Sequence, residues 1–513
     1  MSPLSATVAK AAMLASFAAE PGAADAPSAL RSLIAFVIVL VVGLPLLFGW
    51  ARMVRPMHLA LGFAATALLW VLGYVALLQP GLAVGELLFG LMLAVLFGAG
   101  FVAGRYGDGD VRPMTVGLVS AIANLLVVGA FLRDEQHGST WTPIAWVVGL
   151  VAVSMALAHL GGATGRRFRS TRALPSAVTL FAAVTATTVF LLIVLGGVLT
   201  GEEAGLAVPD WPNSFGHNML LYPVSEMKGG VFYEHAHRLY GMLVGATSAV
   251  LVVIVWKGTR MSWLRGLAVA LLCMICVQGL LGGMRVTGRP TLEVDRSLLA
   301  PSTALAIVHG VFAQIVFAAS LVIAAGTTRL YSSTTRPFAS SWSALDRRLA
   351  MWLPPVALMQ LILGALYRHL QTPGGATAPG HPMWAINLHM TMAIVVVGMV
   401  AIACGRAWIH AAHPVLVRLA QVIATLVSIQ LVLGVMAVAA VWTRKGAVIP
   451  AFELTVTTLH QGVGALILGA STLFACWSRR LLANETTTDG VIEMKPDARD
   501  AAPSEPAEVL HAR

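Results

Sequence analysis

The chain has 513 residues, of which 58% are hydrophobic and only 11% are charged, and its mean hydropathy is +0.82. Soluble domains are about one-quarter charged, so the composition excludes a soluble globular protein and predicts an all-α polytopic membrane protein, since transmembrane β-strands would be shorter and would alternate. The formal charge of +10 indicates Lys and Arg anchors at cytoplasmic helix ends. A nucleic-acid partner is not expected, because the sequence has no basic soluble domain.

The predicted helices fall into an N-terminal region and a longer C-terminal region. Residues 1–29 have no proper apolar core and make a poor signal peptide. Residues 30–165 predict an additional transmembrane region of about five helices, at about 30–50, 57–78, 83–103, 114–132 and 144–162. Eight more runs follow at about 174–199, 235–256, 265–284, 303–325, 350–367, 384–405, 415–441 and 455–477. The polar residues 482–513 predict a disordered tail.

Lysine and arginine gather at one end of the predicted helices. This set includes Arg166, Arg167, Lys257, Arg347, Arg406 and Arg479. Assigning this end to the cytoplasm satisfies the positive-inside rule and predicts a cytoplasmic C-terminus. Arg285 and Arg368 lie at the opposite end, where the rule disfavours them.

The last eight predicted helices contain an internal repeat. The stretch "QGLLGGMRV" begins at Gln278 and "QLVLGVMAV" begins at Gln430, which is 152 residues later (430−278). The first helix of each half ends in a similar way, "VLGGVLTG" and "ILGALYRH". The sequence therefore predicts an eight-helix core of two pseudo-repeated four-helix bundles, residues 173–330 and 345–481.

Four histidines obey the same repeat. His237 and His389 are 152 residues apart (389−237), and His309 and His460 are 151 apart (460−309). Each half thus contributes one histidine from its second helix and one from its fourth. Prolines mark the starts of three of these helices, and the histidines lie about 10–15 Å further into the membrane. Equal depth on alternate helices allows the two imidazoles of one half to face each other.

Ionisable groups within a membrane are costly and are usually functional. Imidazole is an axial ligand of heme iron, and heme sites in bundles are built from facing helices. Zinc would need three or four ligands in one cluster. Buried polar pairs that only bond to neighbouring helices are the simpler alternative. The symmetry favours two heme sites, with the iron ligands His237, His309, His389 and His460.

The stretch "EHAHR" opens one of these helices. Glu234 lies three residues before His237 and shares its face, whereas His235 points to the other side and is interpreted as an interfacial polar residue. The second half has Ile386 where Glu234 would be repeated (234+152). A carboxylate in only one of two similar sites marks that site as the one that performs chemistry, although a simple ion pair between Glu234 and Arg238 is the alternative.

Three arginines occupy non-cytoplasmic helix ends, namely Arg238, Arg285 and Arg368. They are candidates to bind heme propionates in a bidentate manner. Interfacial snorkelling is the alternative for each.

At these residues the sequence resembles the heme A synthase family. The matching elements are "EHAHR", the loop "AVPDWPNSFG" from Ala207, "GGMRV" and "VHG" in the first half, and "NLHM" and "LHQG" in the second. The resemblance implies eight helices in two halves and oxidation of a ring methyl of heme O to the formyl group of heme A. It also implies that Glu234 is the catalytic carboxylate, that His237 and His309 flank the substrate heme, and that His389 and His460 hold a heme b.

The resemblance further implies a multi-pass protein of a bacterial-type inner membrane. Its partners would be heme O as substrate, a heme O synthase, an electron donor and cytochrome oxidase assembly factors, and a homo-oligomer is compatible with it. Many bacterial members carry a cysteine pair in the first outer loop, where this chain has Val208 and Ser214. A di-heme electron-transfer subunit of the cytochrome b type and a heme carrier or exporter are the alternative functions.

Overall fold

The computed structural model describes residues 54–78, 81–107, 111–132, 141–287, 302–333, 337–371, 380–444, 446 and 448–484. Within these residues the chain is almost entirely helical, and eleven helices are long and apolar enough to cross a membrane. The predicted all-α polytopic fold is therefore confirmed. The expected segment 1–29, the expected helix at 30–50 and most of the expected tail lie outside the described residues.

Each apolar run that falls on described residues coincides with a long helix. The N-terminal region has α5 (Pro56–Leu77), α6 (Leu82–Tyr106), α7 (Pro113–Leu132) and α8 (Trp141–Arg167). The first half of the core has α9 (Ala177–Gly201), α10 (Gly230–Gly258), α11 (Ser262–Thr287) and α12 (Thr303–Gly326). After the short α13 (Arg329–Ser333), the second half has α14 (Ser343–Leu370), α15 (Met383–His410), α16 (Pro414–Thr443) and α17 (Ala451–Leu481).

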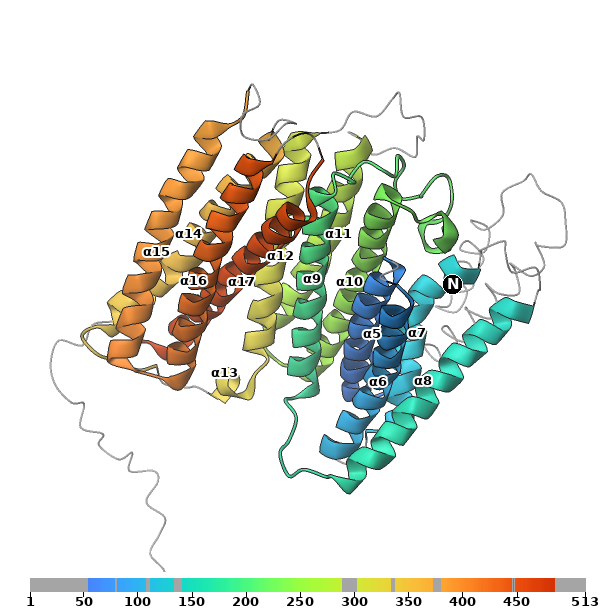
Figure 1. Cartoon of the computed structure of the whole chain (residues 1–513). Helices are drawn as coiled ribbons and strands as arrows, with labels where there is room; N and C mark the ends of the chain where they lie inside the picture. Colours follow the sequence, from blue (N-terminus) through green and yellow to red (C-terminus); the bar gives the residue numbers. More distant parts are fainter. Residues whose placement is uncertain are drawn as a thin grey trace, which may run out of the picture.

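The three groups of helices lie in a row, with the first half of the core between the second half and the N-terminal region (Figure 1). The two halves meet where α9 and α12 contact α17 and where α12 contacts α14. Successive long helices run in opposite directions, so α10, α12, α15 and α17 all begin at one end of the bundle. We call that end the outer end. Residues 202–229, which connect α9 to α10, lie there.

Local sequence signals place the helix starts. Proline is the first residue of α5, α7 and α16, where its missing N–H is not needed for a helical hydrogen bond. Ser302 caps α12 by accepting a hydrogen bond from the backbone N–H of Leu305 at 3.2 Å. Because α12 starts at this cap, the depth of His309 in the membrane is fixed locally.

The N-terminal region packs against the first half through α5. Trp70 meets Tyr240 of α10 edge to face, with ring centroids 5.2 Å apart, and Tyr74 lies 5.0 Å from Phe232 of the same helix. Trp70 also donates a hydrogen bond from its indole Nε1 to Oδ1 of Asn124 in α7 at 2.9 Å. The N-terminal region therefore supports the helix that carries Glu234.

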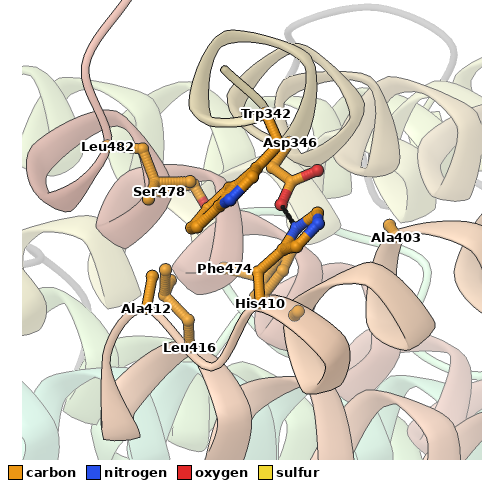
Figure 2. Close-up of a pocket in the computed structure, with 10 residues that line it drawn as sticks. Trp342, Asp346, Ala403, His410, Ala412, Leu416, Phe474, Ser478 and Leu482 are labelled. Atoms are coloured by element: carbon orange, nitrogen blue, oxygen red, sulfur yellow. Dashed lines mark hydrogen bonds and ion pairs between the residues drawn. The ribbon is translucent and has the colours of Figure 1, made fainter. Parts of the chain in front are cut away.

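A polar cluster closes the inner end of the second half (Figure 2). The two oxygens of Asp346 accept hydrogen bonds from Nε of Arg406 and from Nδ1 of His410, both at 2.5 Å. The His410 ring stacks on Trp342 with centroids 4.0 Å apart. Because Asp346 is on α14 and its two donors are on α15, this cluster joins two helices of the half.

Candidate functional site

The structure brings the predicted histidines together in two similar pairs. The ring centroids of His237 and His309 are 6.5 Å apart with an interplanar angle of 70°, and those of His389 and His460 are 6.3 Å apart at 70°. The four histidines lie six to nine residues after the starts of their helices. Two imidazoles that bind one metal from opposite sides, each at about 2 Å, have centroids about 6 Å apart. Both pairs meet this condition.

A glycine on the preceding helix lies behind each imidazole. A methyl group in place of the hydrogen of Gly196, Gly282, Gly364 or Gly434 would come 3.2, 3.2, 3.0 or 3.1 Å from Cε1 of His237, His309, His389 or His460, respectively. Contacts this close would push the ring away from the helix. The four glycines therefore let each ring lie directly against a neighbouring backbone.

Glutamine side chains contact three of the four histidines. Gln278 donates a hydrogen bond from Nε2 to the backbone oxygen of His309 at 2.7 Å. Gln360 Nε2 lies 3.0 Å from the backbone oxygen of His389 and 3.2 Å from its Nε2. Gln430 Nε2 lies 3.3 Å from Nε2 of His460. An amide that donates to Nε2 requires the lone pair on that atom, and this is the tautomer that binds a metal through Nε2.

These features fit a planar iron-containing group better than a bare metal ion. Among the described residues, no group of three or more His, Cys, Asp or Glu side chains could hold a metal ion. Each pair supplies two opposed ligands, as a heme with two axial histidines needs. Nδ1 of His237, His309 and His460 is buried without a hydrogen-bond partner in the described structure, and the amide of Gln430 marks Nε2 of His460 as the nitrogen that carries the lone pair.

Glu234 lies beside the first pair and is held on both oxygens. It is 3% exposed. Its Oε1 accepts a hydrogen bond from Nη2 of Arg238 at 2.7 Å, and its Oε2 accepts one from the backbone N–H of Val208 at 2.9 Å. The ion pair with Arg238, which was the alternative to a catalytic role for Glu234, is therefore present. It fixes the carboxylate between the helix and the outer loop.

Arg238 binds that loop as well as Glu234. Its Nη1 donates to the backbone oxygens of Asp210 at 2.7 Å and Asn213 at 2.9 Å, and its Nη2 lies 3.2 Å from the backbone oxygen of Val208. These bonds leave the guanidinium little donor capacity for a propionate. The structure thus places Arg238 at the base of the loop.

The two loop positions at which the family resemblance predicts cysteines also make polar contacts. Val208 binds Glu234 through its backbone, and the hydroxyl of Ser214 lies 3.1 Å from Nδ1 of His235. Asp210, which is fully buried, accepts hydrogen bonds from the backbone N–H groups of Phe215 and Gly216 at 2.7 and 2.8 Å. His235 therefore anchors the loop, on the side of α10 away from His237.

The other two predicted arginines lie at the outer ends of their helices. The guanidinium of Arg285 lies against Gly205 and interacts electrostatically with Glu234. Arg368 donates from Nη2 to the backbone oxygen of Thr200 at 2.8 Å and from Nη1 to Oε1 of Gln371 at 3.4 Å. Arg368 thus joins the two halves at the outer end.

Sequence reasoning missed the supporting glycines and glutamines. The repeated stretches "QGLLGGMRV" and "QLVLGVMAV" each contain a glutamine followed four residues later by a glycine. Residues four apart share one face of a helix, so this spacing was the available signal. Which residue each glutamine or glycine contacts depends on the part of the neighbouring helix that packs against this face.

Comparisons with known proteins agree with this geometry. A family described as cytochrome oxidase assembly protein (COX15-CtaA) matches residues 178–373. The heme A synthase of Caulobacter sp. (strain K31) is 26% identical over 370 residues, which are 61% of this chain and 98% of that protein. The heme A synthase of Rhodospirillum centenum is 26% identical over 354 residues (60% and 89%), and heme A synthase COX15 of Bos taurus is 31% identical over 147 residues (22% and 35%). Two opposed histidine pairs in two similar halves are consistent with this similarity to heme A synthases.

Proposed function

We propose that the chain is a heme A synthase that oxidises a ring methyl of heme O to a formyl group, for use in cytochrome oxidase assembly. One observation supports this proposal above the others. The two histidine pairs have nearly the same geometry. Among the described residues, only the first pair has a buried carboxylate one helical turn from a histidine, Glu234 before His237, whereas the buried Glu453 lies seven residues before His460. A protein that only holds two hemes has no need of that difference.

In this proposal the first half binds the substrate. His237 and His309 would hold heme O between them, and Arg285, at the outer end, would bind a propionate. Oxidation of the methyl develops positive charge on its carbon, and a fixed negative charge near that carbon lowers the barrier. Both oxygens of Glu234 already accept hydrogen bonds, so it can supply this charge without rearrangement. If Glu234 also accepted a proton, that proton would have to compete with the hydrogen bond that Arg238 donates to Glu234.

The second half is the site for heme b, held by His389 and His460. When bound, heme b would supply one-electron redox chemistry beside the substrate site. Gln360 and Gln430 keep the lone pairs of these imidazoles on Nε2, and Arg368 is available for a propionate at the outer end. Contact of α17 with α9 and α12 places the two sites in adjoining bundles.

The proposal implies a multi-pass protein of a bacterial-type inner membrane with a cytoplasmic C-terminus. The basic residues at the ends of α8, α10 and α17 lie at the inner end of the bundle, in agreement with the positive-inside rule. A heme O synthase, an electron donor and cytochrome oxidase assembly factors are the partners that this activity would require.

Pigment analysis of the purified full chain tests the function. We expect heme b together with heme A or a hydroxylated precursor, and conversion of added heme O when a reductant and dioxygen, which accepts the electrons removed from the methyl group, are both present. Finding only heme b, without conversion, would contradict the proposal and favour a di-heme electron-transfer subunit. Heme O that is bound but never altered would favour a carrier.

A further inference from the structure

Helix α11 carries two adjacent glycines, and only one of them is repeated in the second half. Gly282 corresponds to Gly434, which is 152 residues later (434−282), and both lie behind an imidazole. Gly283 corresponds to Val435 (283+152), a side chain that is 72% exposed. The scaffold that the two histidine pairs share therefore explains Gly282 but not Gly283.

Gly283 makes room for a tryptophan of the outer loop. A methyl group in place of its hydrogen would overlap Cγ, Cδ2 and Cε3 of the Trp211 indole. At Gly279, one turn earlier on α11, no described atom lies within 4 Å of such a methyl group. The indole of Trp211 thus lies directly on the backbone of α11, beside the glycine that supports His309.

The backbone of the same loop segment holds Glu234. Arg238 donates hydrogen bonds to Glu234 and to the two backbone oxygens that flank Trp211–Pro212. The backbone N–H of Val208 donates to the other oxygen of the carboxylate. The segment is therefore attached to α10 through its backbone and to α11 through its indole.

We infer that Trp211 is a positioning residue of the first site, and that its contact with Gly283 fixes Glu234 relative to His309. The inference deepens the proposed function and rests on it. Glu234 and Gly283 are both absent from the repeat, as expected of two residues that serve the same site. Misplacement of a catalytic group by about 1 Å costs up to about 100-fold in rate, so attachment of the loop to a second helix matters for the reaction.

Two alanine substitutions on α11 test the contact while Trp211 itself is kept. Gly283→Ala should displace the indole and lower kcat for heme O by about 10- to 100-fold, with KM and heme content as in the wild type. Gly279→Ala, its matched control, should change none of these quantities. Normal kcat in a folded, heme-loaded Gly283→Ala protein would overturn the inference. A higher KM or a loss of heme with kcat unchanged would also overturn it, because Trp211 would then form the heme-binding site without positioning Glu234.

Hydrogen exchange measures the same contact without turnover. The amide of Val208 is bonded to Glu234, so its exchange should be about tenfold faster in Gly283→Ala, as expected when about one hydrogen bond is lost. Amides of residues 411–413, at the inner end of the second half, should exchange as in the wild type. Unchanged exchange at Val208 in a chain that converts heme O would overturn the inference alone. A wild-type chain that never converts heme O would instead defeat the proposed function, whatever the exchange rates.

A second set of variants covers the case in which Gly283→Ala does not fold. Trp211→Ala removes the indole without creating a clash, so exchange at Val208 should again be about tenfold faster. Trp211→Phe, which keeps a ring against Gly283, should recover part of this change. Adding Gly283→Ala to Trp211→Ala should have no further effect, because the new methyl group no longer meets an indole. Wild-type exchange in Trp211→Ala, or additive effects in the double variant, would overturn the inference.

Discussion

The two halves of the core share a ligand geometry but differ in what surrounds it. The histidine pairs agree within 0.2 Å in centroid separation (6.5 and 6.3 Å) and have the same interplanar angle. The connection before the first pair is residues 202–229, whereas residues 371–382 precede the second. Glu234 in the first half is replaced by the buried Ile386 in the second. The repeated scaffold thus determines where the imidazoles of each half meet, and the unrepeated parts determine which charged groups lie near them.

The longer connection also explains how a carboxylate is kept in the membrane. A buried charge is costly unless it is paired and hydrogen-bonded. The first half supplies Arg238 and the backbone N–H of Val208 to Glu234. The second half has its own buried ion pair, Arg444–Glu453 at 3.3 Å, but this pair joins the ends of α16 and α17. It does not lie on the helix of His389.

The largest expected effect comes from removing the charge that distinguishes the halves. Glu234→Gln should lower turnover of heme O by about 100- to 1000-fold, as is typical when one stabiliser of transition-state charge is lost, while two hemes remain bound. Product formation and heme content measure the two effects. Glu453→Gln, a buried carboxylate of the second half, is the matched control. Normal turnover in Glu234→Gln would remove Glu234 from the mechanism.

The converse change inserts a carboxylate into the second half. Ile386→Glu should lower the free energy of unfolding by about 3 kcal/mol, because the new charge is buried without a partner. Adding Met390→Arg, which repeats the spacing of Glu234 and Arg238, should restore part of this loss. Thermal unfolding of the single and double variants gives the coupling free energy between residues 386 and 390. No recovery in the double variant would show that the ion pair depends on the outer loop.

A smaller effect is expected at the base of the loop. Arg238→Lys keeps the charge but cannot bind Glu234 and three backbone oxygens at once. We expect turnover to fall about tenfold, which corresponds to about 1.4 kcal/mol, and limited proteolysis to cut residues 202–229 faster. Arg444→Lys, at the ion pair of the second half, should leave the cleavage rate of this loop unchanged. If Arg238→Lys keeps full activity and its loop is cleaved no faster than in the wild type, then Arg238 does not hold the loop in place.

The smallest effect concerns the anchor between Ser214 and His235. Ser214→Ala removes one hydrogen bond, so the free energy of unfolding should fall by about 1 kcal/mol. Ser428→Ala is the control, since its hydroxyl bonds only to a carbonyl of its own helix in the described structure. Equal stability of the two variants would show that this contact does not hold the loop.

The sequence predicted the elements well because the helix signal is local. Each apolar run from 57–78 onward gave a helix, since about 20 apolar residues span a bilayer only as a helix. The repeat of 152 residues predicted which histidines would lie on corresponding helices, and the structure places them in those pairs. The role of Arg238 was less accessible, because its partners are backbone oxygens of a loop without periodic structure.

The sequence by itself determined the membrane class, the duplication, and the depth of each histidine below its helix start. The tertiary structure decided which groups meet those histidines. The glutamines and glycines lie on neighbouring helices, so their contacts depend on how the helices pack and rotate against one another. The loop that holds Glu234 is likewise fixed by contacts that form only when the chain folds. Hydropathy and spacing are properties of one segment, whereas hydrogen bonds between segments exist only once the segments are packed.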